Sequence, residues 1–73
     1  MEEYVIYSSP NCGYCVQAKK LLDLKDLPYT IMDAASSMYF QREFVDKGIR
    51  KVPQVFLGDR HIGGFEELMG ELM

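Results

Sequence analysis

Two cysteines, Cys12 and Cys15, are the only thiols of the chain and are separated by just two residues. A thiolate attacks a disulfide sulfur, and a second nearby thiol can then resolve the mixed disulfide that forms. A bridge over so short a loop would constrain little of the unfolded chain, so a structural cross-link explains the pair poorly. The spacing therefore predicts redox chemistry, with Cys12 as the attacking thiolate and Cys15 as the resolving thiol.

Other roles for the cysteines find less support in the residues. A structural zinc ion takes four ligands, and the only histidine, His61, would bring the count to three. We therefore expect no metal site, and we expect His61 to lie on a hairpin strand and face water. Free cysteines can also serve as small buried apolar side chains, but their place between a predicted strand and a predicted helix argues against that role.

The elements around the pair predict how it is positioned. Residues 4–7 form a β-branched and aromatic run typical of a buried strand, and residues 8–11 have loop chemistry. From Gly13 to about Lys25 the apolar residues recur at helical spacing. Unpaired N–H groups and the helix dipole at such an N-terminus stabilise a thiolate and lower its pKa. Cys12 is therefore predicted to be the exposed, low-pKa thiol, and Cys15 to lie one turn inward.

The rest of the chain predicts three more strands and two more helices. Ser36 and Ser37 are candidate N-caps for the second helix, and Gly48 is expected to end it. The first two strands should be parallel with a right-handed crossover, and the last two should form a hairpin. With no repeat or linker visible, residues 1–73 are expected to form a single domain in the order βαβ, then α, then ββα. The expected strands cover residues 29–32, 54–57 and 60–62, and the expected helices cover about 38–47 and 65–73.

Charge and hydropathy exclude several classes of function. The net charge of −3 argues against a nucleic-acid partner, because nucleic-acid-binding domains are usually basic. No apolar run reaches the roughly 20 residues of a membrane span, and the N-terminus is acidic, unlike a secretory signal. We therefore expect a cytoplasmic protein, in a compartment where disulfides are usually transient and catalytic.

Two further segments are informative without being decisive by themselves. Val52-Pro53 precedes a strand pattern, which suits a proline because it cannot donate a ladder hydrogen bond. Its peptide bond can be trans or cis, since X–Pro bonds lower the cost of the cis form. Gly63-Gly64 can be a plain turn or a place where backbone approaches a ligand closely.

Taken together, these segments resemble the glutaredoxin family over nearly the whole chain. The matching pieces are Y-S-S-P-N-C-G-Y-C at residues 7–15, V-P-Q-V-F-L at residues 52–57 and I-G-G-F-E-E-L at residues 62–68. The resemblance implies an α/β, thioredoxin-like fold with a four-stranded mixed sheet and three helices. It also implies a glutathione-dependent thiol–disulfide oxidoreductase that reduces protein disulfides or glutathione mixed disulfides, with glutathione as co-substrate and no tightly bound cofactor.

The resemblance also implies a glutathione groove beside the cysteines, with the Val52–Pro53 bond in the cis form. In the family, the backbone before the cis proline pairs with the cysteinyl part of glutathione, and a Gly-Gly-x-Asp segment holds its γ-glutamyl end. The family's usual cation near the first cysteine is replaced by Ser9, so we expect a nearby cation, Lys51 or Arg50, to supply that charge. The residues expected to bind glutathione are Tyr14, Lys51, Val52, Pro53, Gly64, Phe65 and Glu66.

Two alternatives remain open. Gly13 stands where the family usually has proline, and some glutaredoxins without that proline hold a [2Fe–2S] cluster between two protomers, with glutathione as extra ligands. A related class of small proteins is reduced by thioredoxin reductase and donates electrons to ribonucleotide reductase. The main expectation is a monomer that acts on glutathione and on disulfide-containing proteins.

Overall fold

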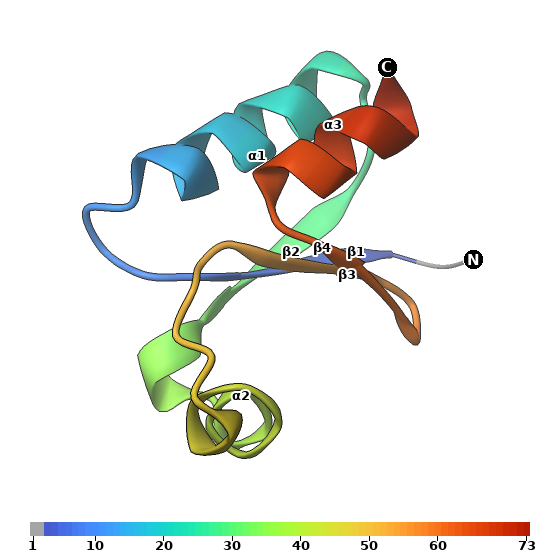
Figure 1. Cartoon of the computed structure of the whole chain (residues 1–73). Coiled ribbons are helices and arrows are strands. Elements are labelled where there is room, and N and C mark those ends of the chain that lie inside the picture. Colours follow the sequence, from blue (N-terminus) through green and yellow to red (C-terminus); the bar gives the residue numbers. More distant parts are fainter. Residues whose placement is uncertain (1–2) are drawn as a thin grey trace.

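Four short strands form one mixed sheet in the computed structural model, which describes residues 3–73 (Figure 1). The central strand β1 pairs in parallel with β2 and antiparallel with β3, and β3 and β4 form the predicted hairpin. The order across the sheet is β2-β1-β3-β4. The strands are β1 (Tyr4–Ser8), β2 (Tyr29–Asp33), β3 (Gln54–Leu57) and β4 (Arg60–Gly63).

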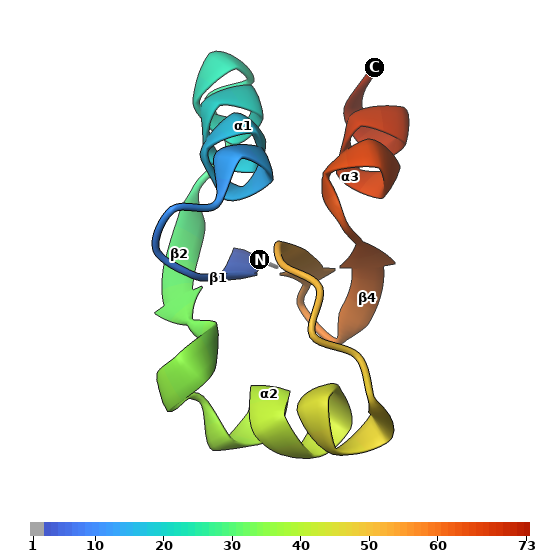
Figure 2. The same cartoon turned by 60° about the vertical axis from the view of Figure 1, so that its left-hand side comes forward.

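The helices cover the two faces of this sheet unequally. Figures 1 and 2 show α1 and α3 side by side on one face and α2 alone on the other. Within residues 3–73, no helix is long and apolar enough to cross a membrane. The helices are α1 (Gly13–Leu24), α2 (Met38–Glu43) and α3 (Phe65–Leu72), with single 3-10 turns at η1 (Ala34–Ser36) and η2 (Val45–Lys47).

Each face of the sheet has its own apolar core. Ile6 and Val55 are register partners on β1 and β3, and both are fully buried beneath α1 and α3. Ala18 and Leu22 of α1 meet them, as the spacing of three and four residues predicts. Burial of each large aliphatic side chain contributes about 1.5–3 kcal/mol, so this core anchors the N-terminal turn of α1 on the sheet.

The second face is aromatic, and it corrects one prediction. The single helix expected over residues 38–47 is wrong: α2 ends at Glu43, and Phe44, at φ −124° and ψ −59°, separates it from η2. The Phe44 ring packs against Phe40 and Phe56, with centroids 5.0 and 6.1 Å away. We infer that burying this ring outweighs one more turn of regular helix. Gly48, at φ +84°, ends the segment as predicted.

Of the two serines predicted as N-caps of the second helix, Ser37 caps α2 and Ser36 does not. The Ser37 hydroxyl accepts a hydrogen bond from the Phe40 N–H at 3.1 Å and is the N-cap. Ser36 instead donates to the Asp33 carboxylate at 3.0 Å, within η1.

Candidate functional site

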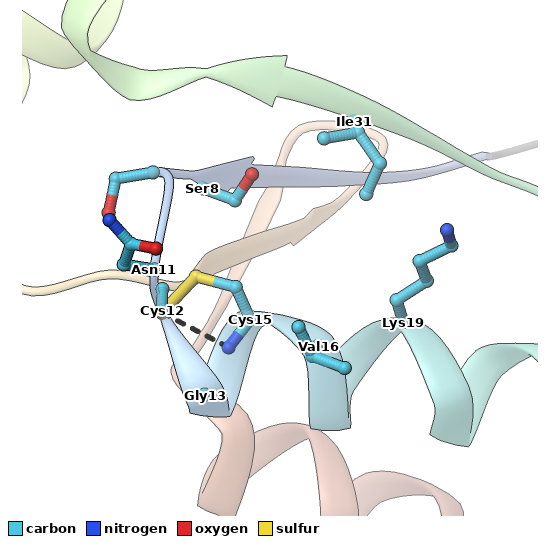
Figure 3. Close-up of a pocket in the computed structure, with 9 residues that line it drawn as sticks. Ser8, Asn11, Cys12, Gly13, Cys15, Val16, Lys19 and Ile31 are labelled. Carbon is cyan, nitrogen blue, oxygen red and sulfur yellow. Dashed lines mark hydrogen bonds between the residues drawn. A yellow bond between two sulfur atoms is a disulfide. The ribbon is translucent and has the colours of Figure 1, made fainter.

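The two cysteines lie where the loop after β1 leads into α1. Cys12 is the N-cap of α1, and its sulfur accepts a hydrogen bond from the Cys15 N–H at 3.1 Å (Figure 3). The two residues form a disulfide with their Cα atoms 5.3 Å apart. Cys12 is half-buried, whereas Cys15 is only 6% exposed. Cys15 lies inward, as the helical spacing predicts, whereas Cys12 is less exposed than predicted.

This position favours a negative charge on Cys12 once the disulfide is reduced. The first turn of α1 contains no acidic residue, and its N–H groups point toward the Cys12 end. An N–H bond to a charged acceptor is stronger than one to a neutral acceptor, and the helix dipole acts in the same direction. The local structure therefore supplies what a nucleophilic thiolate needs.

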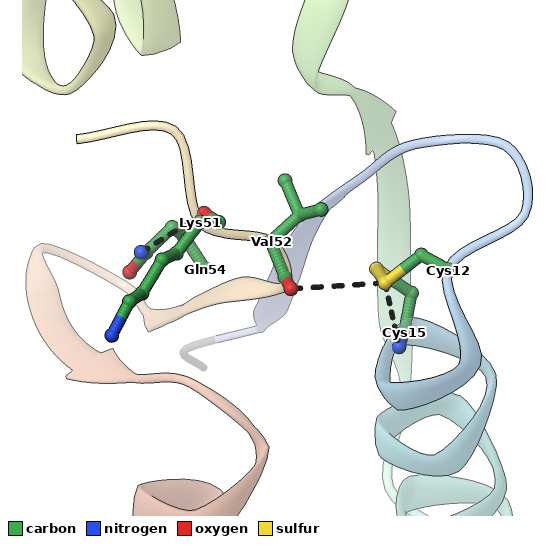
Figure 4. Close-up of a disulfide and its surroundings, with 5 residues drawn as sticks. All are labelled: Cys12, Cys15, Lys51, Val52 and Gln54. Carbon is green, nitrogen blue, oxygen red and sulfur yellow. Dashed lines mark hydrogen bonds between the residues drawn. A yellow bond between two sulfur atoms is a disulfide. The ribbon is translucent and has the colours of Figure 1, made fainter. Parts of the chain in front are cut away.

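A backbone platform lies directly across from Cys12. The Val52–Pro53 peptide bond is cis, as the resemblance implies, and the buried Pro53 immediately precedes β3. The Val52 carbonyl oxygen lies 3.7 Å from the Cys12 sulfur (Figure 4). A disulfide sulfur carries no proton, so this approach is a contact and not a hydrogen bond. It brings together two segments that are 40 residues apart in the chain.

A groove of about 470 Å³ extends from this platform to the N-terminus of α3. All seven residues expected to bind glutathione line it, including the exposed Lys51. Four further lining residues were not among the predicted ones. They are Gln54, His61, Gly63 and Glu67.

The unpredicted residues had partial signals in the sequence. Gln54 lies inside the V-P-Q-V-F-L motif, and His61 directly precedes the I-G-G motif. His61 lies on β4 and is exposed, as predicted, but its imidazole is also engaged. Its Nε2 lies 2.8 Å from Gln54 Oε1, and its ring stacks on Phe56 with centroids 4.7 Å apart. Nothing in the local pattern indicates these contacts.

The two glycines, Gly63 and Gly64, form one wall of the groove, which we call the glycine wall. Gly63 has φ +126°, and a Cβ added to Gly64 would lie 3.6 Å from the Pro53 carbonyl oxygen. The Gly64 N–H donates to Glu67 Oε1 at 2.7 Å, which caps α3. The glycine pair therefore lies beside the backbone of Pro53 at the end of β4, and its approach to a ligand stays a prediction.

The groove also has an aromatic end. Tyr14, which is 63% exposed, stacks on Phe65 with ring centroids 5.9 Å apart and planes inclined by 30°. This pair joins the N-terminal turns of α1 and α3 and bounds the space between the cysteines and the glycine wall.

A second, wider hollow of about 700 Å³ lies on the other side of the disulfide. Ser9 lines this hollow. Val16, Lys19 and Ile31 line it as well (Figure 3). Within residues 3–73, no three His, Cys, Asp or Glu side chains gather in a way that could hold a metal ion.

Comparison with known proteins agrees with this geometry. The model of the glutaredoxin family matches residues 4–62, which include both cysteines, the proline platform and His61. The chain belongs to the glutaredoxin family. Members of this family are thiol–disulfide oxidoreductases, and the present chain has their thioredoxin-like fold with a four-stranded mixed sheet and three helices.

Individual glutaredoxins extend the match over most of the chain. A glutaredoxin of Neisseria meningitidis serogroup A is 34% identical over 71 residues, covering 93% of this chain and 82% of that protein. Glutaredoxin 1 of Rickettsia typhi is 36% identical over 67 residues, covering 88% of this chain. The chain spans only 64% of the length of that Rickettsia relative.

A solved glutaredoxin shows the same arrangement. The crystal structure of a buckwheat glutaredoxin–glutathione complex superposes with a TM-score of 0.79 and 32% sequence identity. The match covers 96% of this chain and 67% of the buckwheat chain. The fold, including the elements that position the cysteines, is therefore shared with a protein solved in complex with glutathione.

Proposed function

We propose that this chain is a glutathione-dependent thiol–disulfide oxidoreductase of the cytoplasm, which reduces protein disulfides and glutathione mixed disulfides. The observation that carries the proposal is the position of Cys12. It caps α1 and lies 3.7 Å from the carbonyl oxygen of Val52, a residue that lines the groove together with Gly63 and Gly64. The Cys12 sulfur therefore lies next to a backbone carbonyl of the groove.

The first step is attack by the Cys12 thiolate on the glutathionyl sulfur of a mixed disulfide. A new bond forms between Cys12 and that sulfur, the old S–S bond breaks, and the substrate leaves as a thiolate. The Cys15 N–H, which bonds the Cys12 sulfur at 3.1 Å, stabilises the attacking charge before the reaction.

The second step can follow either of two routes. A glutathione thiolate attacks the glutathionyl sulfur, which forms oxidised glutathione and releases the Cys12 thiolate. Alternatively, the Cys15 thiolate attacks the Cys12 sulfur, which releases glutathione and forms the Cys12–Cys15 disulfide. The structure contains that disulfide, and two glutathione molecules would then reduce it. Each step exchanges one S–S bond for another, so electrons balance.

The groove offers complementary groups for each part of glutathione. The Val52 backbone is proposed to pair with the cysteinyl residue, and Tyr14 to line that part of the groove. The N-terminus of α3 leaves N–H groups of Phe65 and Glu66 for the γ-glutamyl carboxylate, since the first N–H groups of a helix have no intrahelical partner. The Glu66 carboxylate matches the γ-glutamyl ammonium, and Lys51 matches the glycyl carboxylate.

Turnover of a small glutathione mixed disulfide tests the proposal. We expect activity with glutathione and glutathione reductase, and much less with thioredoxin reductase. Cys12→Ser should abolish turnover, whereas Cys15→Ser should keep part of it, because glutathione can replace Cys15 in the second step. Equal loss in both variants would contradict the glutathione mechanism. It would favour a strictly dithiol electron donor, such as one serving ribonucleotide reductase.

A second candidate function, binding of a [2Fe–2S] cluster between two chains, is favoured by Gly13. A Cβ at this position would meet no heavy atom within 4 Å apart from its chain neighbours and its own helix backbone, so no other part of the fold covers this turn. Such a cluster takes four sulfur ligands, which Cys12 of each chain and two glutathione thiols would supply. Anaerobic purification with glutathione tests it. Visible absorbance in a dimeric fraction supports the cluster, and a colourless monomer argues against it.

A further inference from the structure

The side chain of Gln54 is an unusual feature of the groove because its carboxamide is buried. Gln54 is only 7% exposed and is the first residue of β3, next to the core residue Val55. A buried amide costs about 1–3 kcal/mol unless it is hydrogen-bonded. Gln54 meets this requirement with two partners: its Nε2 donates to the Lys51 carbonyl at 3.1 Å, and its Oε1 lies 2.8 Å from His61 Nε2.

The chemistry of the partners determines the direction of both bonds. The Lys51 carbonyl can only accept a hydrogen bond, so the amide nitrogen of Gln54 must face it. The amide oxygen then faces His61, and His61 must donate from Nε2. Neutral imidazole with its proton on Nε2 and the imidazolium ion both satisfy this requirement.

His61 is itself held by the aromatic core of the α2 face. Its ring stacks on Phe56 at 4.7 Å with planes inclined by 27°, and it meets the edge of Phe44 at 5.3 Å and 66°. Phe44 and Phe56 are 6% and 8% exposed. A continuous set of contacts therefore leads from the core, through His61 and Gln54, to the Lys51 carbonyl.

The end of this series lies beside the sulfur chemistry. Lys51 belongs to an irregular segment between η2 and β3, and the next residue, Val52, carries the carbonyl that lies 3.7 Å from the Cys12 sulfur. The Gln54 side chain extends back past the cis Val52–Pro53 bond and donates to the Lys51 carbonyl, which precedes Val52 (Figure 4). Neither Gln54 nor His61 contacts Cys12 through a hydrogen bond in the described residues.

We propose that Gln54 and His61 are positioning residues that hold the Lys51–Val52 backbone in the orientation that receives the cysteinyl part of glutathione. This inference rests on the proposed function and adds two residues to its groove. They act on the binding surface and not on the nucleophile. Loss of either contact should therefore raise KM for a glutathione mixed disulfide and leave kcat and the reactivity of Cys12 almost unchanged.

His61→Phe is the most selective variant, because it keeps an aromatic ring against Phe56 and Phe44 and removes the Nε2–H donor. Loss of this partly buried hydrogen bond predicts a KM about three- to tenfold higher, with kcat within about twofold of the wild type. His61→Gln places an amide N–H near the position of Nε2. This variant loses the ring but keeps a donor, so its KM should be close to that of the wild type. If ring packing mattered and the hydrogen bond did not, His61→Gln would have the raised KM and His61→Phe would not.

Gln41 provides a matched control on a different element. Its Nε2 donates to the Ala34 carbonyl at 3.3 Å, so it makes the same kind of bond away from the groove. Gln54→Leu should raise KM at least as much as His61→Phe, whereas Gln41→Leu should leave KM unchanged. The rate at which iodoacetamide alkylates reduced Cys12 should be equal in all four variants and in the wild type. NMR spectra of each variant establish that it is folded.

The outcomes separate this inference from the proposed function. If the wild-type protein shows no glutathione-dependent turnover, the proposed function is wrong, and so is the positioning role of Gln54 and His61. Wild-type turnover combined with an unchanged KM in folded His61→Phe overturns the positioning role alone. Equal loss of kcat and of the alkylation rate also overturns it, since that result would place the effect at Cys12.

Discussion

Gly63 and Gly70 offer substitutions of the same kind with opposite expected effects on stability. Gly63 joins β4 to α3 at φ +126°, whereas Gly70 lies inside α3, where an added Cβ would have no heavy atom within 4 Å. We expect Gly63→Ala to destabilise the protein and Gly70→Ala to stabilise it. The pair tests whether the wall of the groove requires glycine for its backbone conformation and not for flexibility in general.

The size of the Gly63 effect follows from two contributions. A residue with a side chain at such a positive φ costs about 1–3 kcal/mol. The new Cβ would also lie 2.8 Å from Glu67 Cγ and 2.9 Å from Glu67 Cβ. Movement of Glu67 would break its 2.7 Å bond to the Gly64 N–H, a cap worth about 1 kcal/mol. The sum is about 2–4 kcal/mol, a large part of the roughly 4–11 kcal/mol expected for 73 residues.

Thermal and urea unfolding measure both changes. A loss of about 2–4 kcal/mol lowers Tm by at least about 8 °C in a domain of this size. Gly70→Ala should raise stability by about 0.5–1 kcal/mol, because alanine loses less backbone entropy in a helix. Glu67→Ala, which loses only the cap, should cost about 1 kcal/mol. A Tm for Gly63→Ala within about 2 °C of the wild type would refute the reasoning.

Three further predictions concern charge and reactivity. Iodoacetamide near neutral pH should label Cys12 of the reduced protein before Cys15, as peptide mapping would show, and faster labelling of Cys15 would reverse their roles. Lys51→Ala should raise KM for glutathione by no more than about fivefold at low salt and by less at high salt; an unchanged KM at both would mean that Lys51 has no binding role. The hydrogen bond from Arg60 lowers the pKa of Glu71. The Arg60–Glu71 interaction therefore stabilises the folded state above the ordinary glutamate pKa, and this stabilisation is lost as pH falls through the lowered pKa of Glu71. Glu71→Gln should lower the free energy of unfolding in urea at neutral pH, and the variant and the wild type should become equally stable in acid. A difference in stability that persists in acid would contradict this assignment.

The local parts of the structure were predictable from the sequence because their signals lie within a few residues of one another. The spacing of Cys15, Ala18 and Leu22 indicated the buried stripe of α1 and with it the inward position of Cys15. Gly58-Asp59 between the two predicted strands 54–57 and 60–62 indicated the β3–β4 hairpin. Such patterns determine element type, since a helix repeats every 3.6 residues and a strand every two.

Tertiary packing overrode the local pattern in one segment. The helical pattern of residues 38–47 is real, but the Phe44 side chain gains more from the aromatic core than from a continuous helix. Helix propensity differs by only a few tenths of a kcal/mol among most residues, whereas burying a phenylalanine contributes about 1.5–3 kcal/mol. The sequence around Phe44 does not reveal this contact, because Phe56 lies on β3, twelve residues further along the chain.

The sequence by itself indicated the cysteine pair, the helix that follows it and, through family resemblance, seven of the residues that line the groove. Only the tertiary structure decided that Val52 lies against Cys12, 40 residues away, and that His61 holds Gln54 across the hairpin. These contacts depend on how the sheet brings its strands together and how the aromatic core orients each ring. Spacing along the chain encodes which face a side chain occupies, but the partner on that face is chosen by three-dimensional packing.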